Sequence, residues 1–190
     1  LMRLKDGNRL WLPDEIIPAV LRQRLGAKMD RAVVLRAAQQ LGSLRLPTEF
    51  KIAINFFPET FFEGVARDLL DENFVHFAQN GCRICVEITE QQVSGPVLPE
   101  INSIKKNGYR IAVDDFGTGF SNLASVRSLA PHYLKIDRSF VWSMEEMTVR
   151  SSLIPEIVQI ARAVGAQLIA EGVENGAQLE VDLLGQRHHV

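Results

Sequence analysis

The feature that most constrains the fold is a short pattern that occurs three times along the chain. Each copy has a glycine, then a mostly apolar run, then a carboxylate six positions after the glycine; the copies are NGCRICVE at 80–87, NGYRIAVD at 107–114 and VGAQLIAE at 164–171. The glycine is typical of the left-handed residue that ends a helix. The apolar run is typical of a parallel strand buried on both faces. Each copy therefore predicts a helix end, a strand and an acid where the strand ends.

Helix-like stretches separate these strands. Apolar residues recur at helical spacing in GPVLPEINSIKKNG, 95–108, and in SLIPEIVQIARAVG, 152–165. Two more strand candidates are FKIAIN at 50–55 and HYLKID at 132–137. Alternating strands and helices indicate an α/β protein with a parallel sheet. Polar residues gathered at strand ends favour a β/α barrel or an open doubly wound sheet.

Length and composition narrow the class of protein. The 190 residues are 46% hydrophobic and 23% charged, which is ordinary for one globular domain. A β/α barrel usually needs about 250 residues, so we expect residues 1–190 to form a single domain, incomplete at both ends, of a longer polypeptide. A net charge of -2 without a basic block argues against a nucleic-acid polymer as partner. The absence of a membrane-length apolar run and the two cysteines favour a cytoplasmic domain without membrane contact of its own. It is expected either in a cytoplasmic protein or as the cytoplasmic part of a membrane-anchored one.

Adjacent carboxylates at Asp114 and Asp115 leave two interpretations open. The pair lies either on a solvated turn or beside a cation, because neighbouring buried acids repel each other. If the strands are neighbours, Asn55 and Glu87 converge on the same place. All four side chains offer hard oxygen ligands, which favours Mg²⁺ or Mn²⁺ over zinc. Two such ions about 3.5–4 Å apart form the standard clamp for phosphodiester hydrolysis.

Two further residues fit this chemistry. Glu171 ends the third copy of the pattern and is a candidate general base. Lys135 lies in the strand candidate 132–137 and is a candidate partner for the attacking water or for negative charge on phosphorus.

Taken together, several motifs resemble the EAL-domain family of cyclic-di-GMP phosphodiesterases. They are LPDEIIP at 12–18, EITE at 87–90, DDFGTG at 114–119, LKID at 134–137 and AEGVE at 170–174. The resemblance implies a modified TIM-like (β/α)8 barrel that hydrolyses cyclic-di-GMP to linear pGpG with Mg²⁺ or Mn²⁺. It further implies that Lys135 holds the attacking water and that Glu171 is the general base. The implied metal ligands are Asn55, Glu87, Asp114 and Asp115.

The resemblance also implies supporting roles. Glu90 resembles the glutamate that braces the loop after the double aspartate, and that loop in the family leads to a dimer interface. Asp137 and Glu174 resemble residues near metal and substrate. Arg3 matches the arginine of the family's E-A-L-x-R signature and is expected to contact substrate.

Two departures from the family pattern bear on activity. Leu1 matches the leucine of that signature, so the signature glutamate, a metal ligand, would precede the first residue of the sequence. Phe57 stands where the family usually has serine.

Three functions remain open from the sequence. The first is a cyclic-di-GMP phosphodiesterase in bacterial signalling, with a homodimer and a fused sensor domain as expected partners. The second is an inactive receptor that binds cyclic-di-GMP, as some family members do. The third sets the resemblance aside and assigns a Mg²⁺-dependent metabolic β/α-barrel enzyme.

Overall fold

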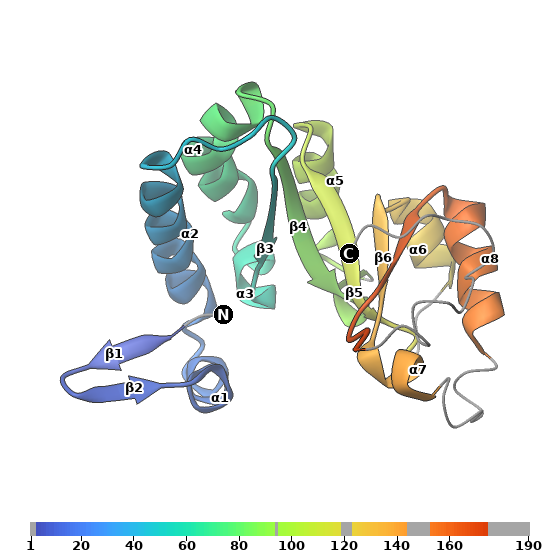
Figure 1. Ribbon diagram of the computed structural model, residues 1–190, viewed down its shortest axis with the longest axis horizontal. Coiled ribbons are helices and arrows are strands. Elements are labelled where there is room, and N and C mark those ends of the chain that lie inside the picture. Colours follow the sequence, from blue (N-terminus) through green and yellow to red (C-terminus); the bar gives the residue numbers. More distant parts are fainter. Residues whose placement is uncertain (1–2, 94, 119–122, 144–152, 175–190) are drawn as a thin grey trace. The chain divides into compact units, whose positions relative to one another are not determined.

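The computed structural model describes residues 3–93, 95–118, 123–143 and 153–174 (Figure 1). The chain divides into two compact units, one with residues 1–50 and 56–82 and the other with residues 51–55 and 83–190. The second unit carries the strands with the repeated pattern.

The second unit is built on a five-stranded parallel sheet whose strands follow in chain order. The strands are β3 (Lys51–Asn55), β4 (Arg83–Thr89), β5 (Arg110–Phe116), β6 (Tyr133–Ile136) and β7 (Gln167–Ala170). All five strand candidates are therefore confirmed. β5 continues past the expected end at Val113 and includes both Asp114 and Asp115.

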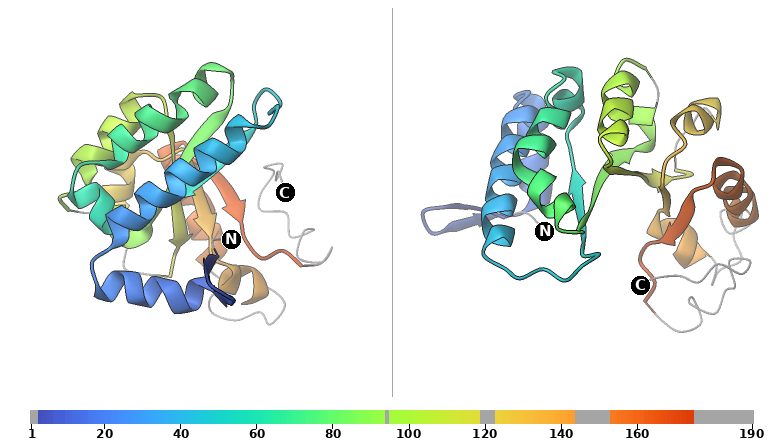
Figure 2. Two further views of the ribbon diagram at one scale, coloured as in Figure 1. Left: turned by 90° about the vertical axis from the view of Figure 1, so that its left-hand side faces the viewer. Right: turned by 90° about the horizontal axis from the view of Figure 1, so that it is seen from above.

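Helices connect these strands, and α5, α6 and α8 lie on one side of the sheet (Figure 2). They are the 3-10 helix η1 (Glu90–Val93) and the α-helices α5 (Leu98–Lys106), α6 (Leu123–Leu129), α7 (Arg138–Ser143) and α8 (Ile154–Val164). Gly165 follows α8 with φ +72°, and Gly108 follows α5 with φ +90°. The glycines thus end the helices in the left-handed conformation that the repeated pattern predicts.

The two faces of the sheet differ in composition. On β4, Ile84, Val86 and Ile88 are at most 2% exposed, whereas Arg83, Cys85 and Glu87 on the other face are half-buried. The expectation of strands buried on both faces is wrong for this strand, because its alternate residues include the charged Arg83 and Glu87 and form a less buried face.

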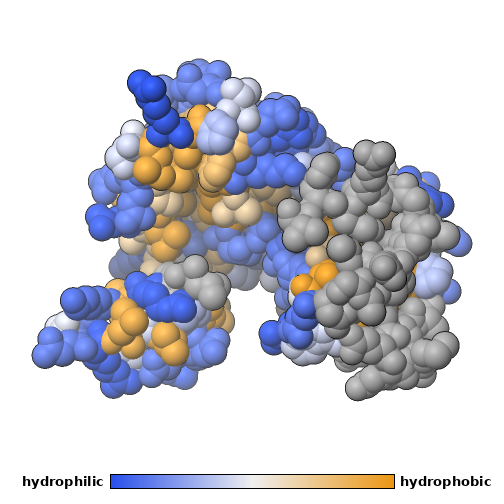
Figure 3. Space-filling model, viewed as in Figure 1, coloured by the Kyte–Doolittle hydropathy of each residue, from blue (hydrophilic) through white to orange (hydrophobic). Residues whose placement is uncertain are grey.

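The first unit has a hairpin of β1 (Leu4–Asp6) and β2 (Arg9–Trp11), followed by α1 (Pro13–Arg22), α2 (Gly26–Gly42), α3 (Pro58–Phe62) and α4 (Ala66–Gln79). Apolar side chains are visible on the surface over β1, β2 and α1 (Figure 3). Those with 37% to 54% exposure are Leu4, Leu10, Leu12, Ile17 and Leu21.

The α/β class is confirmed, and the parallel order is that of a β/α barrel. Within the described ranges the sheet is open, with β3 and β7 at its edges. No described helix is both long and apolar enough to cross a membrane.

A buried carboxylate fastens α3 to α2 within the first unit. Asp30 on α2 is 4% exposed and accepts hydrogen bonds from the Phe57 N–H, at 2.7 Å, and from the Thr60 hydroxyl. Burial raises the pKa of Asp30 to about 7, although the hydrogen bonds from Thr60 and Phe57 lower it; the nearby charge of Glu59 raises it further.

The substitution Asp30→Asn tests this contact. The pKa of Asp30 in the folded protein is above the ordinary value of 3.8. Ionisation of this carboxyl group therefore lowers the free energy of unfolding progressively as the pH rises from about 4 to about 7. We expect the variant to match the wild type near pH 4 in urea unfolding and to be more stable at pH 8 by up to about 4 kcal/mol. The exposed Asp14→Asn is the control, and a pH-independent difference for Asp30→Asn would contradict the assignment.

Candidate active site

The first two polar strand ends lie side by side. Asn55 is the last residue of β3 and is the register partner of Glu87 on β4. The Asn55 amide Nδ2 donates a hydrogen bond of 2.7 Å to Glu87 Oε2. The parallel register thus places an amide and a carboxylate from residues 32 positions apart in direct contact.

A bulge in β5 explains how two consecutive aspartates reach one site. Val113 pairs with Leu134 and Phe116 with Ile136, so β5 has one more residue than β6 over this stretch. Asp115 has φ +52°, in the left-handed region that aspartate tolerates better than most residues. Neighbouring side chains of a regular strand point to opposite faces, and the bulge removes that restriction.

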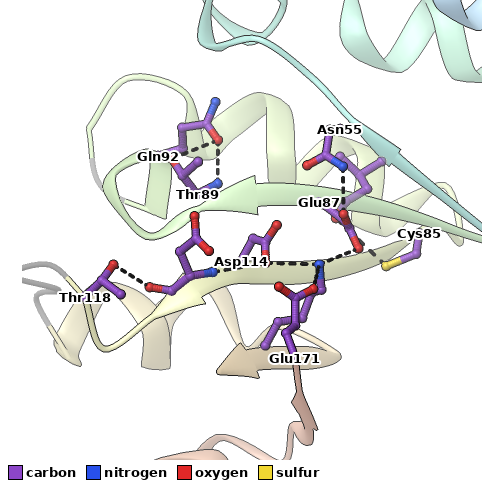
Figure 4. A network of polar contacts seen from close by, with 11 residues as sticks. Asn55, Cys85, Glu87, Thr89, Gln92, Asp114, Thr118 and Glu171 are labelled. Carbon is purple, nitrogen blue, oxygen red and sulfur yellow. Dashed lines mark hydrogen bonds and ion pairs between the residues drawn. The ribbon is translucent and has the colours of Figure 1, made fainter. Parts of the chain in front are cut away.

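The Lys135 side chain on β6 joins three of the strand ends. Its Nζ lies 3.0 Å from Glu87 Oε1, 3.0 Å from Asp114 Oδ1 and 2.7 Å from Glu171 Oε1. Figure 4 shows Glu87, Asp114 and Glu171 directed toward this common point. Burial alone would lower the pKa of Lys135, but hydrogen bonds to the three carboxylates outweigh it and the pKa is raised. Lys135 is therefore a fixed positive charge at the centre of the cluster.

Three carboxylates at the site have the spacing of a cation site. Asp114, Asp115 and Glu171 each offer an oxygen, and these oxygens lie within 4.8 Å of one another. Burial raises the pKa of Asp115, and the negative charges of Asp114 and other nearby acids raise it further, against the effect of Lys135. A divalent cation would relieve this repulsion, and an all-oxygen set fits Mg²⁺ or Mn²⁺. Glu171, expected as a base, thus lies among the expected metal ligands.

The expected supporting residues lie around this cluster. The buried Glu90 accepts a hydrogen bond of 3.2 Å from the Gly117 N–H, directly after β5. Asp137 accepts one of 2.9 Å from the Ser139 N–H at the start of α7. Hydrogen bonds from Ser139 outweigh burial and hold the pKa of Asp137 below its ordinary value.

Other expected residues lie at the limits of the described ranges or outside them. Arg3 is exposed and belongs to the first unit. Glu174 is exposed beyond the end of β7. Leu1 and the DDFGTG residue Gly119 lie outside the described residues.

Sequence reasoning did not identify Trp142. Its indole Nε1 donates a hydrogen bond of 3.1 Å to the carbonyl of Gly172, the residue after Glu171. The two residues are 30 positions apart, and no motif or periodicity links them. Only the spatial approach of α7 to the end of β7 reveals the contact.

The sequence matches a known protein family and several of its members. The model of the EAL domain matches residues 1–183. The chain is 31% identical over 179 residues to the probable cyclic di-GMP phosphodiesterase PdeB of Escherichia coli K12, and 30% identical over 185 residues to the cyclic di-GMP phosphodiesterase PdeL of the same organism. The alignments cover 92% and 93% of this chain, but only 34% of PdeB and 50% of PdeL.

Solved structures agree on the fold. A structure described as the PaMucR phosphodiesterase in complex with c-di-GMP superposes with a TM-score of 0.79, covering 94% of this chain and 74% of the other. The sequence identity of 24% makes this a likeness of fold.

The substitution Lys135→Met tests the electrostatic arrangement. It leaves Glu87, Asp114 and Glu171 without their shared cation, and removing one partner of a buried ion pair costs about 3–5 kcal/mol. We expect a loss of about 3 kcal/mol in urea unfolding at pH 7 without metal, reduced when millimolar Mg²⁺ is added. Lys51→Met, at an exposed residue of β3, is the control. Equal stability of the two variants would contradict the central role of Lys135.

Proposed function

The chain belongs to the EAL domain family, and on that premise we propose that it hydrolyses cyclic-di-GMP to linear pGpG with Mg²⁺ or Mn²⁺. The observation that carries the proposal is the meeting of Glu171, Asp114 and Glu87 around Lys135. Family membership disfavours the metabolic-enzyme alternative.

The proposed ligands are Asn55, Glu87, Asp114 and Asp115, with the Glu171 carboxylate beside them. Bound there, divalent ions would lower the pKa of water and polarise the phosphate oxygens. The carbonyl oxygen of Asn55 remains available to a ligand while its amide nitrogen holds Glu87.

Glu171 is the proposed general base. Its carboxylate accepts a proton as water oxygen forms a bond to phosphorus and the bond from phosphorus to the 3′ oxygen breaks, and that leaving oxygen takes up a proton. Lys135, 2.7 Å from Glu171, orients the carboxylate and offsets negative charge that develops on the phosphoryl oxygens. Arg3 and Glu174 are proposed to contact the substrate, and Glu90 and Asp137 to hold the turns around it.

Partners and location extend the proposal. PdeB and PdeL are about three and two times as long as the regions that align with this chain, which supports a sensor domain fused to this one. We propose that the domain works in the cytoplasm as a homodimer, without membrane contact or nucleic-acid polymer.

A receptor without hydrolytic activity is the second candidate. It is favoured by the ion pairs of Lys135 with Glu87, Asp114 and Glu171 and by the hydrogen bond from Asn55 to Glu87, because these contacts occupy oxygens that a metal ion would need. Micromolar affinity for cyclic-di-GMP with no pGpG formed would select the receptor.

Turnover tests the enzyme directly. We expect the full-length protein with Mn²⁺ to convert cyclic-di-GMP to pGpG, detected by chromatography, and Glu171→Gln to lower kcat by about 10²–10⁴-fold because the base is lost. Glu156→Gln, at an exposed residue of α8, should retain wild-type kcat. Unchanged kcat in Glu171→Gln would refute the assigned base.

Metal affinity is a separate test that needs no substrate. Asp114→Asn removes one charged oxygen from the proposed ligand set, so we expect the dissociation constant for Mn²⁺, measured by calorimetry, to rise at least about tenfold. The exposed Asp68→Asn on α4 should bind Mn²⁺ as the wild type does. Equal affinity in both variants would place the ion elsewhere.

A further inference from the structure

The short helix α7 contacts both turns that follow the acids of the site. It starts directly after Asp137, whose carboxylate accepts a hydrogen bond from the Ser139 N–H. Its residues Phe140 and Val141 are 2% and 3% exposed. The helix is therefore anchored in the core by these side chains and at its first turn by Asp137.

The first contact is with the turn after Asp114 and Asp115. Gly117 has φ +94°, and a Cβ atom there would lie 2.9 Å from Phe140 Cζ. Only glycine permits both this backbone conformation and this approach. Phe140 thus packs directly against the backbone of that turn.

The second contact is with the turn after Glu171. Gly172 has φ +71°, and a Cβ atom there would lie 2.6 Å from Arg138 Cβ. The Gly172 carbonyl accepts the 3.1 Å hydrogen bond from Trp142 Nε1, and the Arg138 guanidinium carbon lies 5.1 Å from the centroid of the Trp142 ring. Trp142 therefore holds this turn by a hydrogen bond, and the Arg138 side chain packs closely against it.

These contacts hold the backbone just before Glu171 and one peptide unit beyond it. The Glu171 N–H donates a 3.1 Å hydrogen bond to the Ile136 carbonyl, and the carbonyl of the following residue, Gly172, accepts the hydrogen bond from Trp142. The continuous segment 135–142 therefore supplies both backbone anchors and Lys135, which binds the Glu171 carboxylate. Trp142 is 41% exposed. We therefore attribute its effect on the Gly172 turn to the hydrogen bond rather than to burial of the ring.

We propose that Trp142 is a positioning residue that holds Glu171 against Lys135 through the Gly172 carbonyl. The inference rests on the proposed function for its kinetic consequence. Removal of the indole N–H frees the Gly172 peptide, and a small displacement of the base lowers the rate of the chemical step without changing substrate contacts.

The substitution Trp142→Phe in the full-length protein keeps an aromatic ring and removes the donor. We expect kcat for cyclic-di-GMP to fall about tenfold with KM unchanged. By hydrogen exchange, the Glu171 amide should exchange faster while amides of β4 keep their wild-type rates. Trp11→Phe is the matched control, because the sequence has two tryptophans and Trp11 lies in the β1–β2 hairpin.

Each result decides the inference. Wild-type kcat in Trp142→Phe, or faster exchange throughout the second unit with a changed KM, would overturn it, since the latter indicates a general loss of stability. If the wild type hydrolyses nothing, the proposed function fails by itself. The exchange rate of the Glu171 amide then still decides whether Trp142 holds this segment, and an unchanged rate overturns the inference.

Discussion

The site depends on the ammonium group of Lys135, which lies within 3.0 Å of carboxylate oxygens from Glu87, Asp114 and Glu171. Without a cation among them, these half-buried acids would repel one another and the strand ends that carry them. Lys135 itself is 9% exposed, and the carboxylates offset the cost of its burial. The same arrangement holds the carboxylates of Asp114 and Glu171 beside Asp115, where a divalent ion would offset their mutual repulsion.

Backbone geometry brings these charges together. Parallel strands in chain order place their carboxyl ends at one edge, where Asn55 and Glu87 are register partners. The bulge in β5 then allows Asp115 to join Asp114, and its left-handed conformation costs on the order of 1 kcal/mol. Such a departure from regular strand geometry at a cluster of acids is typical of functional sites. The helix α7 adds the turns after β5 and β7 to the same framework.

Much of this could be predicted from the sequence because the pattern is local. A glycine, an apolar run and an acid identify β4, β5 and β7, and the motif residues supply Asn55 and Lys135. The sequence could not predict the bulge, because Asp114 and Asp115 read equally well as the turn after a strand that ends at Val113. It could not predict the polar face of β4, where Arg83 and Cys85 interrupt the expected burial. Contacts over long separations, such as Trp142 with Gly172, leave no trace in local periodicity.

Oxygen atoms from separate strands meet beside Lys135, and we propose that they bind a divalent ion there. Anomalous diffraction from crystals of the protein grown with Mn²⁺ tests it most directly. We expect an anomalous peak in contact with carboxylate oxygens of Asp114 and Asp115, with Lys135 still bonded to Glu171. Saturating Mn²⁺ with no peak at these residues, or an Lys135 side chain turned away from all three carboxylates, would contradict it.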